Sequence, residues 1–129
     1  DRIDLHVEVT PVSFDELSNS KPGEKSTLIR ERVIKAREIQ TNRYRHSKKT
    51  HSNAQMNSSH LENSCFLSEE CKSLLKNAMN KLDLSARAYN RILKVSRTIA
   101  DLDGLHSIEK NHLAEAIQYR SLDRDNWAG

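Results

Sequence analysis

Glycine and proline are scarce in this chain, with 3 Gly and 2 Pro among 129 residues. Sandwiches and barrels need turns between many short strands, and these turns draw heavily on both residue types. The scarcity therefore argues against an all-β fold. Apolar residues make up 36% of the chain and charged residues 30%, which is below and above the usual share respectively. We expect a mainly α-helical chain with one modest core and charged helix faces.

Long apolar runs are also missing. No stretch of the length needed to span a membrane occurs, and no charged-then-apolar leader stands at the start. Cys65 and Cys71 are too few for a disulfide framework. These features favour a reduced, cytoplasmic setting. The net charge of +3 is compatible with a nucleic-acid partner but does not indicate one.

Several catalytic motifs are absent as well. The chain has no G-x-x-x-x-G-K-[ST] loop and no G-x-G-x-x-G, so we expect this piece alone neither to bind ATP tightly nor to hydrolyse it. It has no G-x-S-x-G and no H-E-x-x-H. His60 and the two cysteines lack the C-x-x-C spacing of zinc sites, and we expect no bound metal. Cys71 lies on an apolar helix face and is expected to be an ordinary core residue.

Residues 3–9 alternate strictly between apolar and polar side chains, which is typical of a half-buried strand. No second convincing strand follows in the rest of the chain. A single strand cannot satisfy its backbone groups or bury its apolar face. We therefore expect an unpaired strand, and a chain that is a fragment of a larger protein whose sheet lies elsewhere.

Two helices are predicted before residue 47. Ser13 and Glu16 have the spacing of a capping box, and Val12 and Leu17 that of a hydrophobic staple, so a short helix should begin here. A longer helix with apolar residues at helical spacing is predicted over residues 27–46. Residues 47–64 are rich in Ser, Asn and His and are expected to form an exposed loop, with at most a short helical turn.

Three further helices are predicted after residue 64. Ser68 is expected to cap the first of them, because Glu69 and Glu70 follow in the first turn, where the helix dipole favours negative charge. Six apolar residues at spacings of three and four form its inner face: Cys71, Leu74, Leu75, Ala78, Met79 and Leu82.

The second of these helices should be capped by Ser85 and end near Gly104, which suits a left-handed C-terminal cap. Its inner side is expected to hold Tyr89, Ile92, Leu93, Ser96, Ile99 and Ala100. The third helix, over residues 109–120, is expected to bury Leu113, Ala116 and Ile117.

Arg87 and Arg2 are candidate functional residues. Arg87 lies in the first turn of its helix, where the positive end of the dipole disfavours a cation. It is either a surface arginine tolerated at a small cost, or an arginine that meets an anion such as a phosphate together with free backbone amides. Arg2 precedes the predicted strand and is either a surface arginine or a group that reaches a neighbouring molecule.

A basic stretch follows the long helix. Arg43, Arg45, Lys48 and Lys49 surround Tyr44. Such cations can contact nucleic-acid phosphates while the aromatic ring stacks a base. A solvated helix end is the commoner explanation for such a run.

These residues together resemble a known family. Asp1-Arg2-Ile3-Asp4-Leu5-His6-Val7-Glu8-Val9 resembles the segment of magnesium-chelatase-like AAA+ proteins in which an arginine finger precedes the last core strand. Residues 84–102 resemble the sensor-2 helix of that family, and residues 112–120 its closing helix. The subgroup it resembles most is the bacterial ComM/YifB type. The resemblance covers residues 1–17 and 65–124.

The resemblance implies a division of the chain and a role for two arginines. Residues 1–20 would end the AAA+ core, residues 21–64 would form an insert helix and polar loop, and residues 65–129 would form the helical lid. Arg2 would be the arginine finger and Arg87 the sensor-2 arginine. Both would touch the γ-phosphate of ATP, bound with Mg²⁺ by a P-loop core outside this chain, in the same or a neighbouring subunit.

The implied whole protein is a homo-oligomeric ring, a hexamer, that couples ATP turnover to DNA remodelling such as branch migration. Two alternatives stay open. In the first, the chain is a helical protein-interaction module with no ATPase role. In the second, it is part of the ATPase subunit of a metal chelatase.

Overall fold

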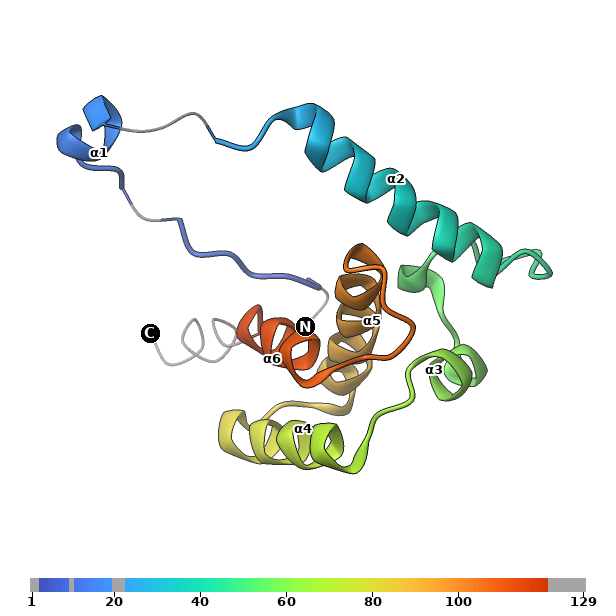
Figure 1. Cartoon of the computed structure of the whole chain (residues 1–129). Helices are drawn as coiled ribbons and strands as arrows, with labels where there is room; N and C mark the ends of the chain where they lie inside the picture. The colour runs from blue at the N-terminus through green and yellow to red at the C-terminus, as the bar shows by residue number, and fades with distance from the viewer. Residues whose placement is uncertain (1–2, 10, 20–22, 121–129) are drawn as a thin grey trace.

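The computed structural model describes residues 3–9, 11–19 and 23–120 and is helical throughout its ordered elements (Figure 1). The elements in chain order are α1 (Phe14–Asn19), α2 (Ser26–Arg43), the 3₁₀ helix η1 (Asn53–Gln55), α3 (Ser58–Ser64), α4 (Glu69–Leu82), α5 (Ala86–Leu102) and α6 (Lys110–Gln118). The mainly helical fold class is confirmed. Within the described ranges no helix has both the length and the apolar character needed to cross a bilayer.

Residues 3–9 are extended but form no strand ladder, so the predicted strand is absent from the described part of the chain. The segment lies instead against the helical bundle. The backbone N–H of His6 donates to the carbonyl of Tyr119 at 3.0 Å, and Asp4 pairs with Arg91. A strand needs a neighbouring strand for its backbone groups, and none of the described segments provides one.

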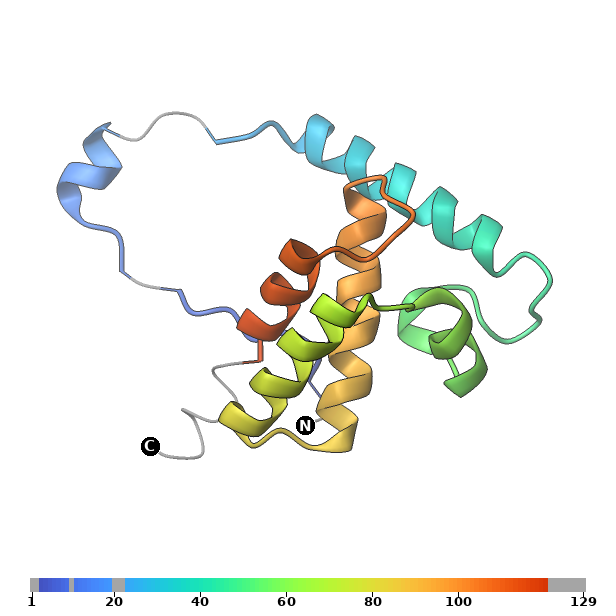
Figure 2. The same ribbon diagram turned by 60° about the horizontal axis from the view of Figure 1, so that its bottom comes forward.

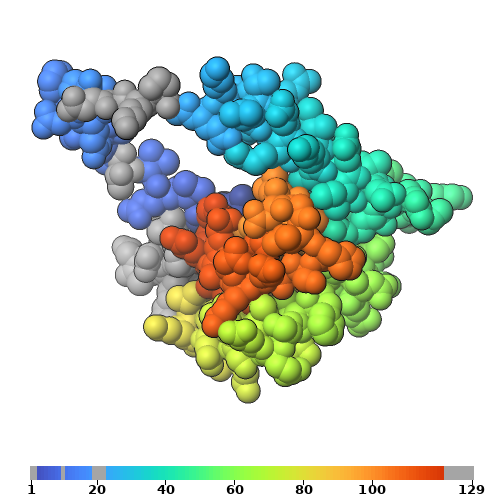
Figure 3. Space-filling view, viewed as in Figure 1, coloured from blue at the N-terminus to red at the C-terminus, as the bar shows by residue number. Residues whose placement is uncertain are grey.

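The short helix α1 begins as predicted. The backbone N–H of Ser13 donates to Glu16 Oε2 and that of Glu16 to Ser13 Oγ, both at 3.2 Å, which is a capping box. Val12, Leu17 and Phe14 are nevertheless exposed. Figure 1 shows α1 standing apart from the bundle, and the space-filling view agrees (Figure 3). Helix α1 therefore adds little to the core.

Helices α4, α5 and α6 pack together as a bundle, with α5 in contact with both α2 and α6 (Figure 2). The predicted caps are present, since Ser68 Oγ accepts from the N–H of Cys71 and Ser85 Oγ from that of Ala88, each at 3.2 Å. Each cap satisfies an amide that has no partner within its own helix. The serine signals therefore located two helix starts correctly.

Gly104 ends α5 in the left-handed conformation that its position in the sequence suggested. Its φ is +70°, and its N–H donates to the carbonyl of Asp101 at 3.0 Å. The N–H of Leu105 reaches back to the carbonyl of Ala100 at 2.9 Å. This pair of bonds is a Schellman motif, which turns the chain from α5 toward α6.

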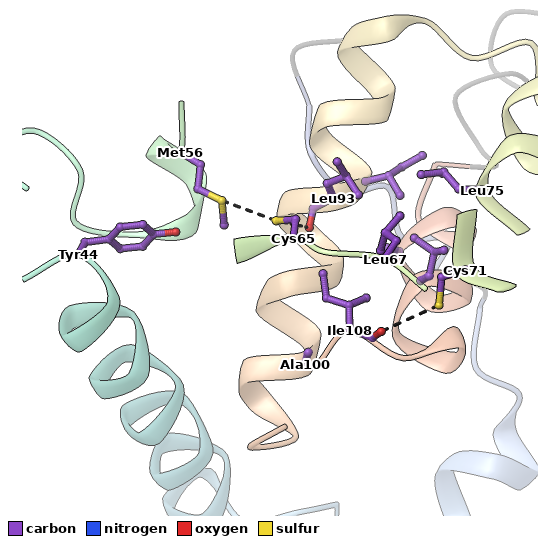
Figure 4. Packing of buried hydrophobic residues seen from close by; sticks show 12 residues of the cluster. Tyr44, Met56, Cys65, Leu67, Cys71, Leu75, Leu93, Ala100 and Ile108 are labelled. Carbon is purple, nitrogen blue, oxygen red and sulfur yellow. Dashed lines mark hydrogen bonds between the residues drawn. The ribbon is translucent and has the colours of Figure 1, made fainter. Parts of the chain in front are cut away.

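The core contains most of the residues predicted for it (Figure 4). Ile92 and Leu113 are fully buried and Leu75 nearly so. The prediction for Tyr89 was wrong, because its side chain is 40% exposed and lines a shallow surface pocket beside Met79 of α4. Tyr89 therefore lies at the edge of the bundle, although its neighbour Ala88 is buried.

Residues 47–64 are more ordered than the sequence suggested. They hold η1 and α3, and Thr50, Asn53 and Met56 are buried. The expected exposed loop is therefore corrected to a segment packed between α2 and α5. Its order comes from hydrogen bonds of the polar side chains rather than from apolar periodicity, which is the signal that the prediction used.

Candidate functional site

Arg87 is the second residue of α5 and is exposed. Its neighbour Ala88 and, one turn on, Ile92 are buried, so the helix is held by its opposite face. Ser85 Oγ accepts a hydrogen bond from the backbone N–H of Ala88, whereas the N–H groups of Ala86 and Arg87 have no acceptor within the helix. The start of α5 thus combines an exposed arginine and backbone donors in one helical turn, a combination that suits an anion.

Arg2 and residues 121–129 lie outside the residues that the structure describes. The basic stretch is divided by the fold. Arg45, Lys48 and Lys49 are exposed, whereas Arg43 is turned inward and paired with α5. These three exposed cations remain available to a partner, and Arg43 has an intramolecular one.

Tyr44 is buried, with 4% of its surface exposed, so its ring is not available to stack a base in this structure. Its hydroxyl donates to Asn53 Oδ1 at 2.8 Å, and its ring meets that of His60 edge-on with centroids 5.3 Å apart. Burial raises the pKa of Tyr44 to about 12. The Tyr44 side chain therefore packs the end of α2 against the segment that follows it.

Asp101, in the last turn of α5, is the centre of a buried polar network. Its carboxylate accepts two hydrogen bonds of 2.8 Å from the guanidinium of Arg43, one of 3.2 Å from Arg97 Nε and one of 2.9 Å from Asn53 Nδ2. The Asp101 side chain is fully buried. Four donors satisfy both of its oxygens, which a buried carboxylate requires.

Arg97 connects this carboxylate to the turn after α5. It is 3% exposed, and its terminal nitrogens donate to the carbonyls of His106 and Leu105, each at 2.7 Å. Arg97 and Asp101 are four residues apart on one helix, so their pairing is local. The arginine therefore anchors the connection between α5 and α6 to the end of α5.

Asn53 connects η1 to both long helices. Its backbone N–H donates to Gln40 Oε1 at 2.9 Å, and its side-chain amide donates to Thr98 Oγ1 at 3.0 Å as well as to Asp101. Its Oδ1 accepts from Arg43 at 3.0 Å and from the Tyr44 hydroxyl. Every polar atom of this buried side chain is used. Sequence reasoning missed Asn53, Arg97 and Asp101; for the last two, an i, i+4 charge pair beside the predicted inner face was the available signal.

His112 was also not predicted to be buried. Its Nδ1 accepts from the N–H of Glu109 at 2.9 Å, so its Nε2 carries a proton and donates to Asp103 Oδ2 at 2.7 Å. The imidazole is 1% exposed. It fixes the start of α6 against the end of α5.

The two cysteines are core residues. Cys71 is 3% exposed, as predicted, and Cys65 lies beside Met56 and the carbonyl of Leu93 (Figure 4). Burial raises the pKa of the Cys65 thiol to about 11. Among the described residues no three His, Cys, Asp or Glu side chains are grouped so as to hold a metal ion.

Comparison with known proteins identifies the family of this chain. The family model described as "Magnesium chelatase, subunit ChlI C-terminal" matches residues 23–120. Competence protein ComM of Haemophilus influenzae is 47% identical over 125 residues, and YifB of Escherichia coli is 39% identical over the same length. An uncharacterized protein of Mycobacterium tuberculosis is 31% identical over 121 residues.

These matches cover 96% of the chain for ComM and YifB and 93% for the mycobacterial protein, and 24% of each relative. The chain thus spans about a quarter of the length of the curated relatives that it matches. The family match runs from just before α2 to the end of the described bundle, so it includes the polar network as well as Arg87. The chain therefore belongs to the magnesium chelatase ChlI C-terminal family, and its helical bundle is a lid domain of the AAA+ type.

Proposed function

We propose that this chain is the lid of a larger ATP-driven ring protein, and that Arg87 is its sensor-2 arginine. The observation that carries the proposal is the exposed position of Arg87 in the first turn of α5, within a segment that matches the family. ATP and Mg²⁺ would be held by a core domain outside this chain, since the sequence contains no phosphate-binding loop.

The role of Arg87 follows from charge. In phosphoryl transfer, negative charge spreads over the transferred group, and a guanidinium placed there stabilises the transition state. The buried face of α5, with Ala88 and Ile92, holds the helix so that Arg87 lies on its exposed face. Arg2 is proposed as the second such group, the arginine finger.

The test is ATP turnover by the full-length protein that contains this chain. Arg87→Ala is expected to lower kcat by an order of magnitude or more, because it removes a charge and little packing. Lys76→Ala, which removes an exposed cation from α4, is the matched control and should leave turnover unchanged. Equal turnover in both variants would reduce Arg87 to a surface arginine.

We also propose the wider arrangement that the family suggests. Residues 1–20 would belong to the core, residues 21–64 would form the insert, and residues 65–129 the lid of a homo-oligomer, a hexameric ring. DNA is the proposed substrate, remodelled at the expense of ATP. Two observations support it: the name of the Haemophilus relative associates that protein with competence, and Arg45, Lys48 and Lys49 are exposed.

Two other functions make different predictions. An interaction module without an ATPase role would lack a phosphate-binding loop in the same polypeptide, so the sequence of the complete protein separates it from the lid. A chelatase subunit would act on a metal and a porphyrin, and the family's descriptive name is the support for it.

A further inference from the structure

Helix α2 is attached to the bundle at one end only. Ala36 and Gln40, in its C-terminal half, are buried, whereas Leu28, Ile29 and Val33 in its N-terminal half are exposed. Figures 1 and 2 both show the helix crossing the end of α5 and extending away from the bundle. The orientation of α2 therefore depends on the contacts that its last turns make.

Those contacts are polar and directional. Arg43 is the last residue of α2, and its two bonds to Asp101 are parallel, which fixes the guanidinium plane relative to the carboxylate. Asn53 closes the network by bonding to Arg43 and to Asp101 at once. An apolar contact tolerates sliding and rotation, whereas a satisfied buried network favours one arrangement.

Helix α5, which holds Asp101 near its C-terminal end, carries the proposed sensor Arg87 near its N-terminal end. Arg87 and Asp101 are 14 residues apart on α5, a separation of about 21 Å at the rise of an α-helix. Helix α5 contains neither Gly nor Pro, and Ile92, Ser96 and Ala100 along its length are buried. It can therefore transmit a rotation from one end to the other without bending.

We infer that Arg43 and Asp101 form a latch that joins α2 and α5 into one rigid lever, and that Arg43 is thereby a positioning residue for Arg87. This inference rests on the proposed sensor role of Arg87. A displacement of α2 by the rest of the protein would then move the start of α5. Conversely, a change of nucleotide that moves Arg87 would also change the position of α2. Removal of the Arg43 side chain, which is 18% exposed, breaks the contact between α2 and α5. Asp101 still keeps Arg97 as a partner, so its buried charge is not left alone.

The first measurement is the distance between α2 and α5 in the full-length protein. Spin labels on cysteines introduced at Arg30 and Asn90, both exposed, report this distance by double electron–electron resonance. A narrow distribution is expected in the parent protein and with Arg37→Ala, which removes another exposed cation from α2. Arg43→Ala and the more conservative Arg43→Gln should both broaden it. A distribution as narrow as that of the parent in both Arg43 variants would overturn the latch.

The second measurement is steady-state ATP turnover of the same proteins without labels. Arg43→Ala is expected to lower kcat by about threefold to tenfold with the KM for ATP unchanged, because Arg43 positions a group and does not touch the nucleotide. In an Arg87→Ala background the same change should cost little more, since the two residues act as one unit. A merely structural defect would add its full loss in that background and would overturn the inference.

The results separate the two hypotheses. If Arg87→Ala lowers turnover but Arg43→Ala leaves it equal to Arg37→Ala, the sensor stands and the latch is overturned. If Arg87→Ala leaves turnover unchanged, the sensor role itself is overturned, and the positioning role of Arg43 with it. Circular dichroism melting of each variant, in full-length protein, verifies that the loss is not one of folding.

Discussion

The guanidinium of Arg43 and the carboxylate of Asp101 face each other across two hydrogen bonds of 2.8 Å, although 58 residues separate them in the chain. The pair joins the ends of α2 and α5, and Arg97 approaches the same carboxylate from within α5. Two cations thus share one buried anion. Removal of one member of such a group lowers the stability of the fold, because a buried charge without a partner keeps its desolvation cost.

Removal of the shared anion should therefore destabilise the fold strongly. Asp101→Ala leaves Arg97, whose side chain is 4% exposed, without a counter-charge. We expect the free energy of unfolding to fall by about 3–5 kcal/mol, measured by urea denaturation. Glu70→Ala removes one partner of the exposed pair with Lys110 and should have little effect. Similar losses in the two variants would contradict the importance assigned to burial.

Signals local to the sequence predicted the helices well. Ser68 and Ser85 each cap the helix that they were expected to cap, and Gly104 adopts the left-handed conformation expected of it. These features depend on residues within a few positions of one another, so a single sequence contains them. The family resemblance over the start of the chain and the bundle was likewise confirmed by the matches to the chelatase family and to ComM.

Features that depend on distant partners were missed. Asn53 looked like a loop residue, because its bonds to Gln40 and Thr98 connect segments that the sequence does not place side by side. Arg43 read as part of a cationic run for the same reason, since Asp101 lies far along the chain. Residues 3–9, expected to be a strand without a partner, form no ladder, because alternation records only side-chain polarity and the neighbouring strand that a ladder needs is not encoded locally.

The two described glycines provide a matched pair for the backbone argument. A Cβ at Gly104 or at Gly23 would meet no atom within 4 Å, but only Gly104 has a positive φ. Gly104→Ala should therefore lower stability by about 1–2 kcal/mol through backbone strain alone. Gly23→Ala should be neutral or slightly stabilising. Thermal denaturation of both variants checks the difference, and equal melting temperatures would contradict a strained turn.

Alkaline pH should weaken the fold through the buried thiol. The pKa of Cys65 is raised to about 11 in the folded chain, above its ordinary value, so between about pH 9 and 11 the unfolded chain has lost a proton that the folded chain retains. Stability from this group is complete below pH 9 and declines as pH rises toward 11. The decline is about 2–3 kcal/mol, since each pKa unit is worth about 1.4 kcal/mol.

Urea unfolding at pH 8 and pH 10.5 measures this effect in the parent chain and in Cys65→Ala. The variant loses packing at both pH values, so the informative quantity is the change with pH. That change should be larger in the parent. Tyr44, whose pKa is also raised by burial, is present in both proteins and cancels in the comparison. An equal pH dependence in the two proteins would mean that Cys65 ionises as readily when folded.

The basic segment makes the final prediction, which concerns DNA. Arg45, Lys48 and Lys49 are exposed next to the end of α2, and Arg43 is left out of this set because it is paired with the buried carboxylate of Asp101. If the three cations bind phosphates, replacing them with Ala in the full-length protein should weaken binding to all DNA sequences alike. The slope of log affinity against log salt should become shallower by up to about one unit for each phosphate that is no longer neutralised.

A matched control separates local phosphate binding from a general reduction in charge. The triple variant Lys72→Ala, Lys76→Ala and Lys110→Ala removes the same number of exposed cations from α4 and α6. Fluorescence anisotropy with a labelled duplex at several salt concentrations, applied to both triple variants, measures affinity and slope together. Because screening reduces the effect of charges that lie far from the DNA, the control should keep nearly the parental slope. Equal slopes in the two variants would remove the basic segment from any DNA path, and the proposed role of Arg87 would not depend on that outcome.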